Sequence, residues 1–302
     1  MGAGKDFEYG TSPDTFEALH CRSCGLVYLD QRPALSELGR IYPPEYHAFD
    51  FSPAKFGLAY AVRRRLEARR ALRWCRGLDA QARILDVGCG DGFHLRLLRD
   101  FGLPGWRLEG IDLSERAVNA ARSVGLTVHP GDVRDLALPA GSYDLALLIA
   151  TIEHVDDPLG VLVALRRLLR PGGRVVIVTD NTQALSFALF KQRHWGGYHF
   201  PRHWNLFNPQ AVRMLAGRAA LELESLRTLV TPVNWVYSIR NALVDWGAPP
   251  WLYDRFSLSA PVSLGVFTLF DGLQQLLGRG GLLEAVFSRP VIHEQNAAAI
   301  AE

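Results

Sequence analysis

The glycine-rich stretch ILDVGCGDGFHL, residues 84–95, is the part of the chain whose residue types most directly indicate chemistry. A dinucleotide fingerprint needs the pattern G-x-G-x-x-G, whose third glycine lets a helix pack closely below a pyrophosphate. Here Gly88 and Gly90 are followed by Phe93 where the third glycine should stand. Carboxylates such as Asp86 in this loop also repel the phosphate that a helix N-terminus attracts. The loop therefore predicts a ligand that carries cationic groups and hydroxyls but no phosphate.

S-adenosylmethionine fits this description because it has an ammonium, a sulfonium and a ribose and lacks a phosphate. A nicotinamide dinucleotide bound to the same type of sheet is the alternative, and the missing third glycine disfavours it. The loop thus favours S-adenosylmethionine as the cofactor, with S-adenosylhomocysteine as the product.

The elements that would position this loop alternate between short apolar runs and helical stretches. Strands are expected over 83–88, 106–113, 126–133, 143–151 and 173–181, with helices between them, one of them capped by Ser114. Strands joined by helical crossovers run parallel within one sheet. A helix over 209–220, a strand over 221–229 and a closing strand over 282–290 complete the pattern. This order predicts an α/β protein with a doubly wound sheet.

Five segments in this order, ILDVGCGDG, GIDLS, GDV, YDLALLIATIEHV and RPGGRVVIV, resemble the class I S-adenosylmethionine-dependent methyltransferases that act on small molecules. The resemblance covers residues 80–230. It implies a Rossmann-like, mostly parallel seven-stranded sheet with helices on both faces, to which this chain adds an N-terminal extension and a helical insertion before the last strand.

The resemblance also implies a role for particular residues. Asp86, Gly88 and Gly90 match the loop that holds the methionine part of the cofactor. Asp112 matches the acid that pairs with the ribose hydroxyls, and Leu113 is its neighbour. Asp132 matches the residue facing the adenine amino group, with Val133 beside it. Ile149 matches the backbone position near the methionine ammonium, and His154 lies one turn further.

Four regions follow from these assignments. They are an N-terminal extension (1–80), a cofactor-binding core (81–231), an apolar helical insertion expected to act as a lid on the acceptor pocket (232–281), and a closing strand with a C-terminal tail (282–302). Ligands of open α/β sheets bind at the carboxyl ends of the strands. An apolar lid at that edge therefore predicts a small, rather apolar acceptor.

The extension contains HCRSCG, which is half of a four-ligand zinc site. Several methyltransferases that act on sugars and other small metabolites open with two such pairs, and this chain resembles the second of them only. The interpretation is that Cys21 and Cys24 are a metal-free remnant, and the alternative is a zinc ion shared between two chains. No metal ligand is assigned.

Charge and hydropathy restrict the partners. A formal net charge of +2 provides no strong field for nucleic acid. The basic helix expected over 55–78 is interpreted as a solvated face, with an anionic lipid surface or an acidic partner as the alternative. The polar start and irregular cysteines favour a cytoplasmic protein, peripheral to a membrane under that alternative. The oligomeric state stays open.

The loop RHWGGYHFPRHWNLFNP, residues 193–209, is the acceptor-side loop in this topology. A histidine titrates near neutral pH and suits a base for a hydroxyl acceptor, so His199 or His203 is the candidate base and Arg202 the candidate anchor for a substrate oxygen. The alternative is a loop packed by aromatic residues, with transfer driven by proximity alone. Pro201 disfavours a helical zinc pair of the two histidines.

The predicted function is methyl transfer from S-adenosylmethionine to a small, rather apolar metabolite, most plausibly at oxygen. Transfer to carbon or nitrogen of a sugar or natural-product intermediate is the alternative within the same class. An alternative of another class is a non-catalytic, methyltransferase-like scaffold or membrane-surface binding protein.

Overall fold

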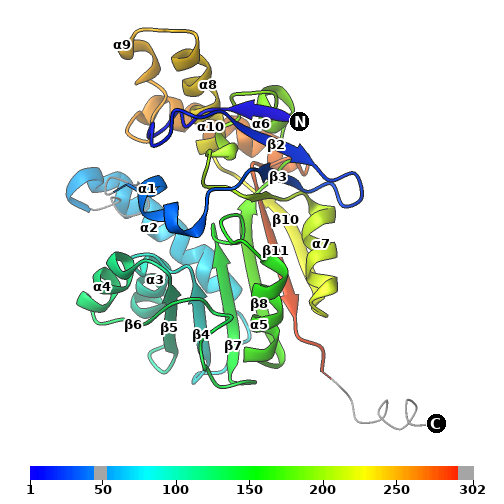
Figure 1. Ribbon diagram of the computed structural model, residues 1–302. Helices are drawn as coiled ribbons and strands as arrows, with labels where there is room; N and C mark the ends of the chain where they lie inside the picture. The colour runs from blue at the N-terminus through cyan, green and yellow to red at the C-terminus, as the bar shows by residue number, and fades with distance from the viewer. Residues whose placement is uncertain (44–52, 292–302) are drawn as a thin grey trace.

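The computed structural model describes residues 1–43 and 53–291. Its centre is a seven-stranded sheet in the order β10-β11-β8-β7-β4-β5-β6 (Figure 1). The five strands β8, β7, β4, β5 and β6 pair in parallel in that order, and β11 runs antiparallel to both of its neighbours. The strands are β4 (Arg83–Val87), β5 (Arg107–Asp112), β6 (Thr127–Pro130), β7 (Tyr143–Ile149), β8 (Leu169–Asp180), β10 (Glu222–Leu229) and β11 (Leu282–Ser288). The predicted fold class is confirmed.

Helices cover both faces because the side chains of each central strand alternate between them. Alternate residues of β7 and β8 form one core with α5 (Pro158–Leu168) and α7 (Pro209–Arg218). The residues between them form a second core with α2 (Pro53–Trp74) and α3 (Phe93–Phe101). On that side, α4 (Glu115–Ser123) packs near the β6 edge.

Side-chain caps begin three of these helices. Ser114 accepts a hydrogen bond from the Ala117 N–H, as its place before α4 predicts. Asp157 and Asn208 cap α5 and α7 in the same way. Pro171, Gly172 and Gly173 follow α5 and lie inside β8, where the pairing of β8 with β7 shifts register. The helix ends at Leu168 without a linker.

The N-terminal extension forms a second, four-stranded sheet above the carboxyl ends of the large one (Figure 1). Its strands are β1 (Gly2–Gly4), β2 (Phe16–His20), β3 (Val27–Asp30) and β9 (Asn205–Leu206), all paired antiparallel. Because β9 belongs to the acceptor loop, the extension and the loop share one sheet. The short helices η1 (Leu35–Glu37) and α1 (Leu38–Ile41) follow this sheet.

The insertion forms α8 (Val233–Asp245), α9 (Pro250–Tyr253) and α10 (Pro261–Leu276). It packs on the segment after β8, which contains α6 (Leu185–Phe190) and η3 (Gly196–Tyr198). The Gly196 N–H donates to Ser238 Oγ at 2.9 Å, so α8 does cover the acceptor loop.

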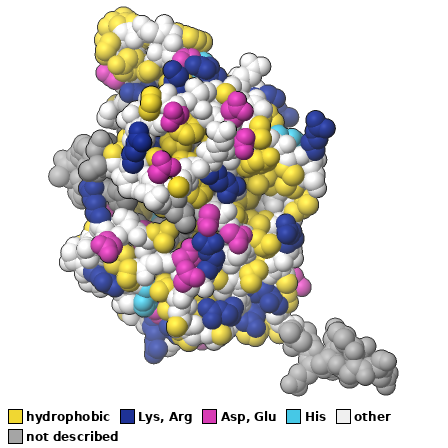
Figure 2. All heavy atoms as spheres, in the orientation of Figure 1, with side chains coloured by type: hydrophobic (Ala, Val, Ile, Leu, Met, Phe, Trp, Pro, Cys, Tyr) yellow, Lys and Arg dark blue, Asp and Glu magenta, His cyan; other side chains and the backbone are white. Residues whose placement is uncertain are grey.

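The outer part of the insertion differs from a simple lid. Trp235 of α8 stacks on Phe267 of α10, and its indole N–H donates to the buried Asp271. The opposite face of α10 exposes a row of aliphatic side chains, Val262, Val266, Leu269, Leu273, Leu276 and Leu277. Figure 2 shows hydrophobic side chains gathered on the projecting lobe of the insertion. Within the described ranges, no helix combines the length and the hydropathy that a membrane span requires.

Candidate active site

The glycine loop lies between β4 and α3, at the carboxyl edge of the sheet. Gly88 and Gly90 have φ angles of +71° and +56°, which side chains with a Cβ rarely adopt. A Cβ atom on Gly88 would lie 2.5 Å from the Thr151 side chain. The loop therefore packs closely against the turn after β7 and presents bare backbone to a ligand.

Asp86 lies near the carboxyl end of β4, directly before the glycine loop, and is 1% exposed. Its Oδ2 atom accepts no hydrogen bond from the described residues. Burial, together with the charge of Asp112, raises the pKa of Asp86 to about 8. A buried carboxylate oxygen without a donor fits the ammonium of a methionine group, and we propose that Asp86 holds it.

Asp112 ends β5 and faces the same loop. Its Oδ2 accepts the Gly90 N–H and its Oδ1 accepts the Ser114 N–H, each at 2.8 Å. Leu113 beside it is exposed and is free to cover a flat ring. Burial raises the pKa of Asp112, which the two backbone donors partly offset. We propose that Asp112 holds the ribose, as the resemblance implies.

The remaining cofactor candidates lie along the same edge. Asp132 accepts hydrogen bonds from the guanidinium of Arg134 at 2.7 and 2.9 Å, and these bonds hold its pKa below the usual range. Val133 is buried under it. Ile149 ends β7, two residues before the Thr151 that contacts Gly88. These positions stay proposals for the adenine and methionine contacts.

His154 lies on the other side of the turn from the glycine loop, among the acceptor-loop histidines. Its ring and that of His203 meet edge to face, with centroids 4.6 Å apart. Its Nδ1 atom lies 2.9 Å from the Tyr42 hydroxyl and 3.1 Å from the Arg202 carbonyl oxygen. His154 therefore contacts the acceptor loop, and its place near the cofactor stays a prediction.

The acceptor loop buries His199 and half-buries His203. His199 Nδ1 lies 3.0 Å from the Glu8 carboxylate, and its backbone is left-handed, with a φ angle of 41°. His203 Nδ1 lies 2.8 Å from the Gly197 carbonyl oxygen and 3.4 Å from the Asp180 carboxylate. Burial, then the charges of nearby basic groups, holds the pKa of His203 well below its usual range. His203 is therefore neutral at pH 7.

Arg202 has a structural role in place of the predicted one. Its side chain is 0% exposed, and its guanidinium donates to both carboxylate oxygens of Asp6, at 2.9 and 3.2 Å. It also donates to the carbonyl oxygens of Ile41 and Phe200. Because these bonds occupy the guanidinium, the expectation that Arg202 anchors a substrate oxygen is corrected: it fixes the N-terminal segment to the acceptor loop.

Three acids of the site were not foreseen. Glu8 comes from the extension, where no sequence pattern indicates an active-site residue. Glu153 and Asp180 follow β7 and end β8, so their location at the carboxyl edge was a usable signal. Burial, with the charge of Asp180, raises the pKa of Glu153 to about 8, and burial raises that of Asp180 to about 6.

Cys21 and Cys24 lie in the turn between β2 and β3, half-buried. Within residues 1–43 and 53–291, no third histidine, cysteine or acid approaches them closely enough to complete a metal site. Cys75 and Cys89 are buried elsewhere. The metal-free remnant and the zinc ion shared between chains both stay open.

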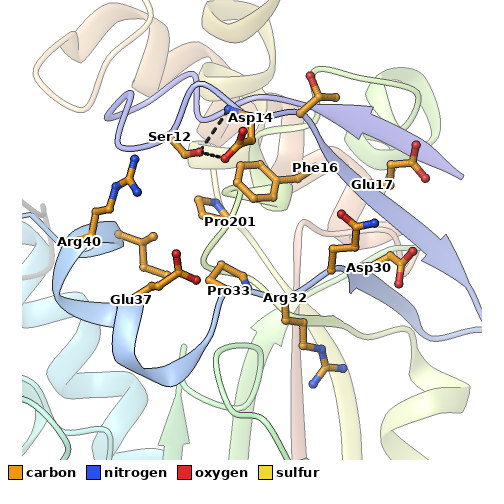
Figure 3. Close-up of a pocket in the computed structure, with 13 residues that line it drawn as sticks. Ser12, Asp14, Phe16, Glu17, Asp30, Arg32, Pro33, Glu37, Arg40 and Pro201 are labelled. Carbon is orange, nitrogen blue, oxygen red and sulfur yellow. Dashed lines mark hydrogen bonds between the residues drawn. The ribbon is translucent and has the colours of Figure 1, made fainter.

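A cavity of about 340 Å³ opens between the N-terminal sheet and α1 (Figure 3). Ser12, Asp14 and Phe16 line one side of it, and Glu37 and Arg40 line the helical side. None of its lining residues belongs to the glycine loop. It lies on the acceptor side of the molecule and is distinct from the proposed cofactor site.

Comparison with known proteins agrees with this geometry. The family model for a methyltransferase domain matches residues 58–226, more than half of the chain. The chain belongs to this methyltransferase family. The ubiquinone biosynthesis O-methyltransferase of Cereibacter sphaeroides is 32% identical over 171 residues, covering 53% of this chain and 68% of that protein. The enzyme of the same name from Thiobacillus denitrificans is 31% identical over 187 residues, covering 56% and 78%.

Two solved structures share the fold of this methyltransferase. Phosphoethanolamine N-methyltransferase 2 of Haemonchus contortus, in complex with S-adenosyl-L-methionine, aligns with a TM-score of 0.55 and 17% identity over 83% of this chain and 59% of that one. Geranyl diphosphate C-methyltransferase of Streptomyces coelicolor aligns with a TM-score of 0.53 and 14% identity over 85% and 90%. The protein is an enzyme that uses S-adenosylmethionine as methyl donor, as predicted.

We expect the raised pKa of Asp86 to make cofactor binding depend on pH. In the free protein this carboxyl group is mostly protonated at pH 7, because its pKa is about 8. The ammonium of S-adenosylhomocysteine favours the ionised carboxylate, so affinity should rise by up to about tenfold per pH unit below pH 8 and level off above it. Calorimetric titrations between pH 6 and 9 measure this slope. Asp86→Asn should bind S-adenosylhomocysteine more weakly and without this slope of affinity against pH. An equal slope in both proteins would contradict the role proposed for Asp86.

Proposed function

We propose that this methyltransferase methylates a hydroxyl oxygen of a small, rather apolar metabolite, with His199 taking the hydroxyl proton. The observation that carries the proposal is the buried pair of His199 and Glu8, 3.0 Å apart. A carboxylate beside Nδ1 stabilises the imidazolium that forms when Nε2 takes the proton. His203 is less suited to this role because burial holds its pKa well below the usual range, so it accepts a proton less readily.

The chain's residues have separate tasks in this reaction. S-adenosylmethionine supplies a methyl group on a positively charged sulfur. Asp86 and Asp112 orient that donor from the glycine-loop side. The acceptor oxygen bonds to the methyl carbon as the carbon–sulfur bond breaks and its electron pair stays on sulfur, while the hydroxyl proton passes to His199 Nε2. Alignment of acceptor and donor supplies the larger part of the acceleration.

The names of the relatives support oxygen as the acceptor atom, since both are ubiquinone biosynthesis O-methyltransferases. Solved structures of the same fold include an N-methyltransferase and a C-methyltransferase, so the fold does not distinguish the three. The test is incubation with methyl-labelled S-adenosylmethionine and panels of phenols, alcohols, sugars and amines. O-methylated products would support the proposal, and label found only on carbon or nitrogen would refute it.

We also propose that α2 contacts an anionic lipid surface. Arg65 and Arg69 of α2 and Arg76, just after its end, are exposed, whereas Arg64, Arg70 and Arg73 are paired with acids of this chain. Each arginine near such a surface contributes about 1 kcal/mol at low ionic strength.

Replacing Arg65, Arg69 and Arg76 by glutamine should therefore lower sedimentation with phosphatidylserine vesicles by more than about tenfold. The matched control replaces Arg107, Arg213 and Arg218, which are exposed elsewhere and carry the same charge. Equal losses in both triple variants, or no sedimentation of the unmodified enzyme, would refute a specific lipid contact.

A further inference from the structure

Three potential metal ligands come together between the turn after β7 and the acceptor loop. Glu153, His154 and His203 each offer one ligand atom, and these atoms lie within 4.8 Å of one another. Glu153 is buried, and the two histidines are half-buried. Ligand atoms that are each about 2.1 Å from one ion lie at most about 4.2 Å apart, so small side-chain adjustments would close this group around a cation.

The hydrogen bonds of the two histidines suit ligands. The His154 Nδ1 atom lies 2.9 Å from the Tyr42 hydroxyl, which can donate or accept, and 3.1 Å from the Arg202 carbonyl oxygen, which can only accept. His203 Nδ1 faces the Gly197 carbonyl oxygen at 2.8 Å, so this nitrogen carries the hydrogen. Metal-bound histidines almost always donate their second ring nitrogen to a carbonyl or a carboxylate. His203 therefore holds the tautomer in which Nε2 carries the lone pair, and the Arg202 carbonyl oxygen offers His154 an acceptor for the same tautomer.

The carboxylates of Glu153 and Asp180 are also oriented by hydrogen bonds from their neighbours. Glu153 Oε2 accepts the Thr179 hydroxyl at 2.9 Å, which orients the group. Asp180 lies 3.4 Å from His203 Nδ1 and accepts a hydrogen bond from the Asn234 amide at 2.7 Å, so it contacts the Nδ1 side of a ligand histidine. Two acids buried this close together favour a compensating positive charge.

We propose that Glu153, His154 and His203 bind one transition-metal dication. Two imidazoles and one carboxylate suit Zn²⁺, Mn²⁺ or Fe²⁺ better than Mg²⁺, which prefers an all-oxygen shell. Three protein ligands leave at least one coordination position open. These residues come from two separate loops and only the fold brings them together, so the sequence predicts no metal site there.

The open position has a use in the reaction. An acceptor hydroxyl bound there would have a lowered pKa, as metal-bound hydroxyls do. The His199 ring, 5.0 Å from that of His203, would then receive the proton. This use rests on the proposed O-methyl transfer, whereas binding of the metal does not.

The test measures metal binding without an acceptor, so its failure is distinct from a failure of the proposed function. The full chain carries Cys21→Ser and Cys24→Ser, which removes these two half-buried thiols as competing ligands. After chelator treatment, Mn²⁺ binding is followed by electron paramagnetic resonance, and bound Zn²⁺ is counted by mass spectrometry after dialysis. The variants are Glu153→Gln and His203→Gln, and the matched control is His129→Gln, whose ring contacts Glu109 in β5.

We expect one dication per chain in the parent and in the control, and at least about tenfold weaker binding in both site variants. Retained S-adenosylhomocysteine binding by the variants would show that they fold. The proposal is overturned if the parent binds neither Mn²⁺ nor Zn²⁺ stoichiometrically, or if both folded site variants bind metal as tightly as the control. If one variant fails to fold, the other decides by the same criterion.

Discussion

Replacing Arg202 by alanine is expected to lower the free energy of unfolding by about 3 to 5 kcal/mol, because it leaves the Asp6 carboxylate buried without its partner. The side chains of this ion pair are 0% and 1% exposed. The change also removes the donors to the Ile41 and Phe200 carbonyl oxygens. Denaturant unfolding measured by circular dichroism gives the difference.

The matched control for Arg202→Ala is Arg193→Ala, nearby on the same loop. Arg193 pairs with Asp245 at the surface, where its side chain is 40% exposed. An exposed pair of this kind contributes at most about 1 kcal/mol. If Arg202→Ala destabilises the enzyme no more than Arg193→Ala does, the structural role assigned to Arg202 is wrong.

Replacing His199 by glutamine should lower kcat by about 10²- to 10⁴-fold with an acceptor identified by the labelling screen, because a positioned base is lost. Glutamine can still donate a hydrogen bond to Glu8 but cannot accept the hydroxyl proton at neutral pH. Binding of S-adenosylhomocysteine and the KM for the cofactor should not change. Steady-state kinetics and calorimetry measure these quantities.

His194→Gln is the matched control for His199→Gln, since His194 lies on the same loop and pairs with Asp245. It should keep the turnover of the unmodified enzyme. Wild-type turnover in His199→Gln would instead mean that alignment alone, without a base, accounts for the reaction.

The core of this fold was predictable because its signals are local and repeated. Apolar runs alternating with helices indicated the parallel sheet, and Ser114 marked a helix start that the structure confirms. Gly88 and Asp86 predicted a closely packed, acidic loop, and the structure shows both properties. Each of these signals depends on neighbours within a few residues.

The acceptor side was less predictable because long-range contacts define it. β3 and β9 are short strands far apart in the sequence, and only their pairing places them in one sheet. Glu8 has no recognisable pattern among its sequence neighbours. Arg202 and His203 are adjacent in sequence, yet one is an internal ion-pair partner and the other a candidate ligand. Composition alone could not separate these roles, since both residue types are common in active sites.

Calorimetric titration with S-adenosylhomocysteine is the measurement that tests the central claim most directly, with NADH as the comparison ligand. The account predicts that S-adenosylhomocysteine binds, that NADH does not, and that Asp112→Ala loses the binding while Asp254→Ala, changed at an exposed position of the insertion, retains it. Thermal unfolding of the two variants checks that each is folded. Absence of S-adenosylhomocysteine binding, or binding that survives in Asp112→Ala, would contradict the cofactor site described above.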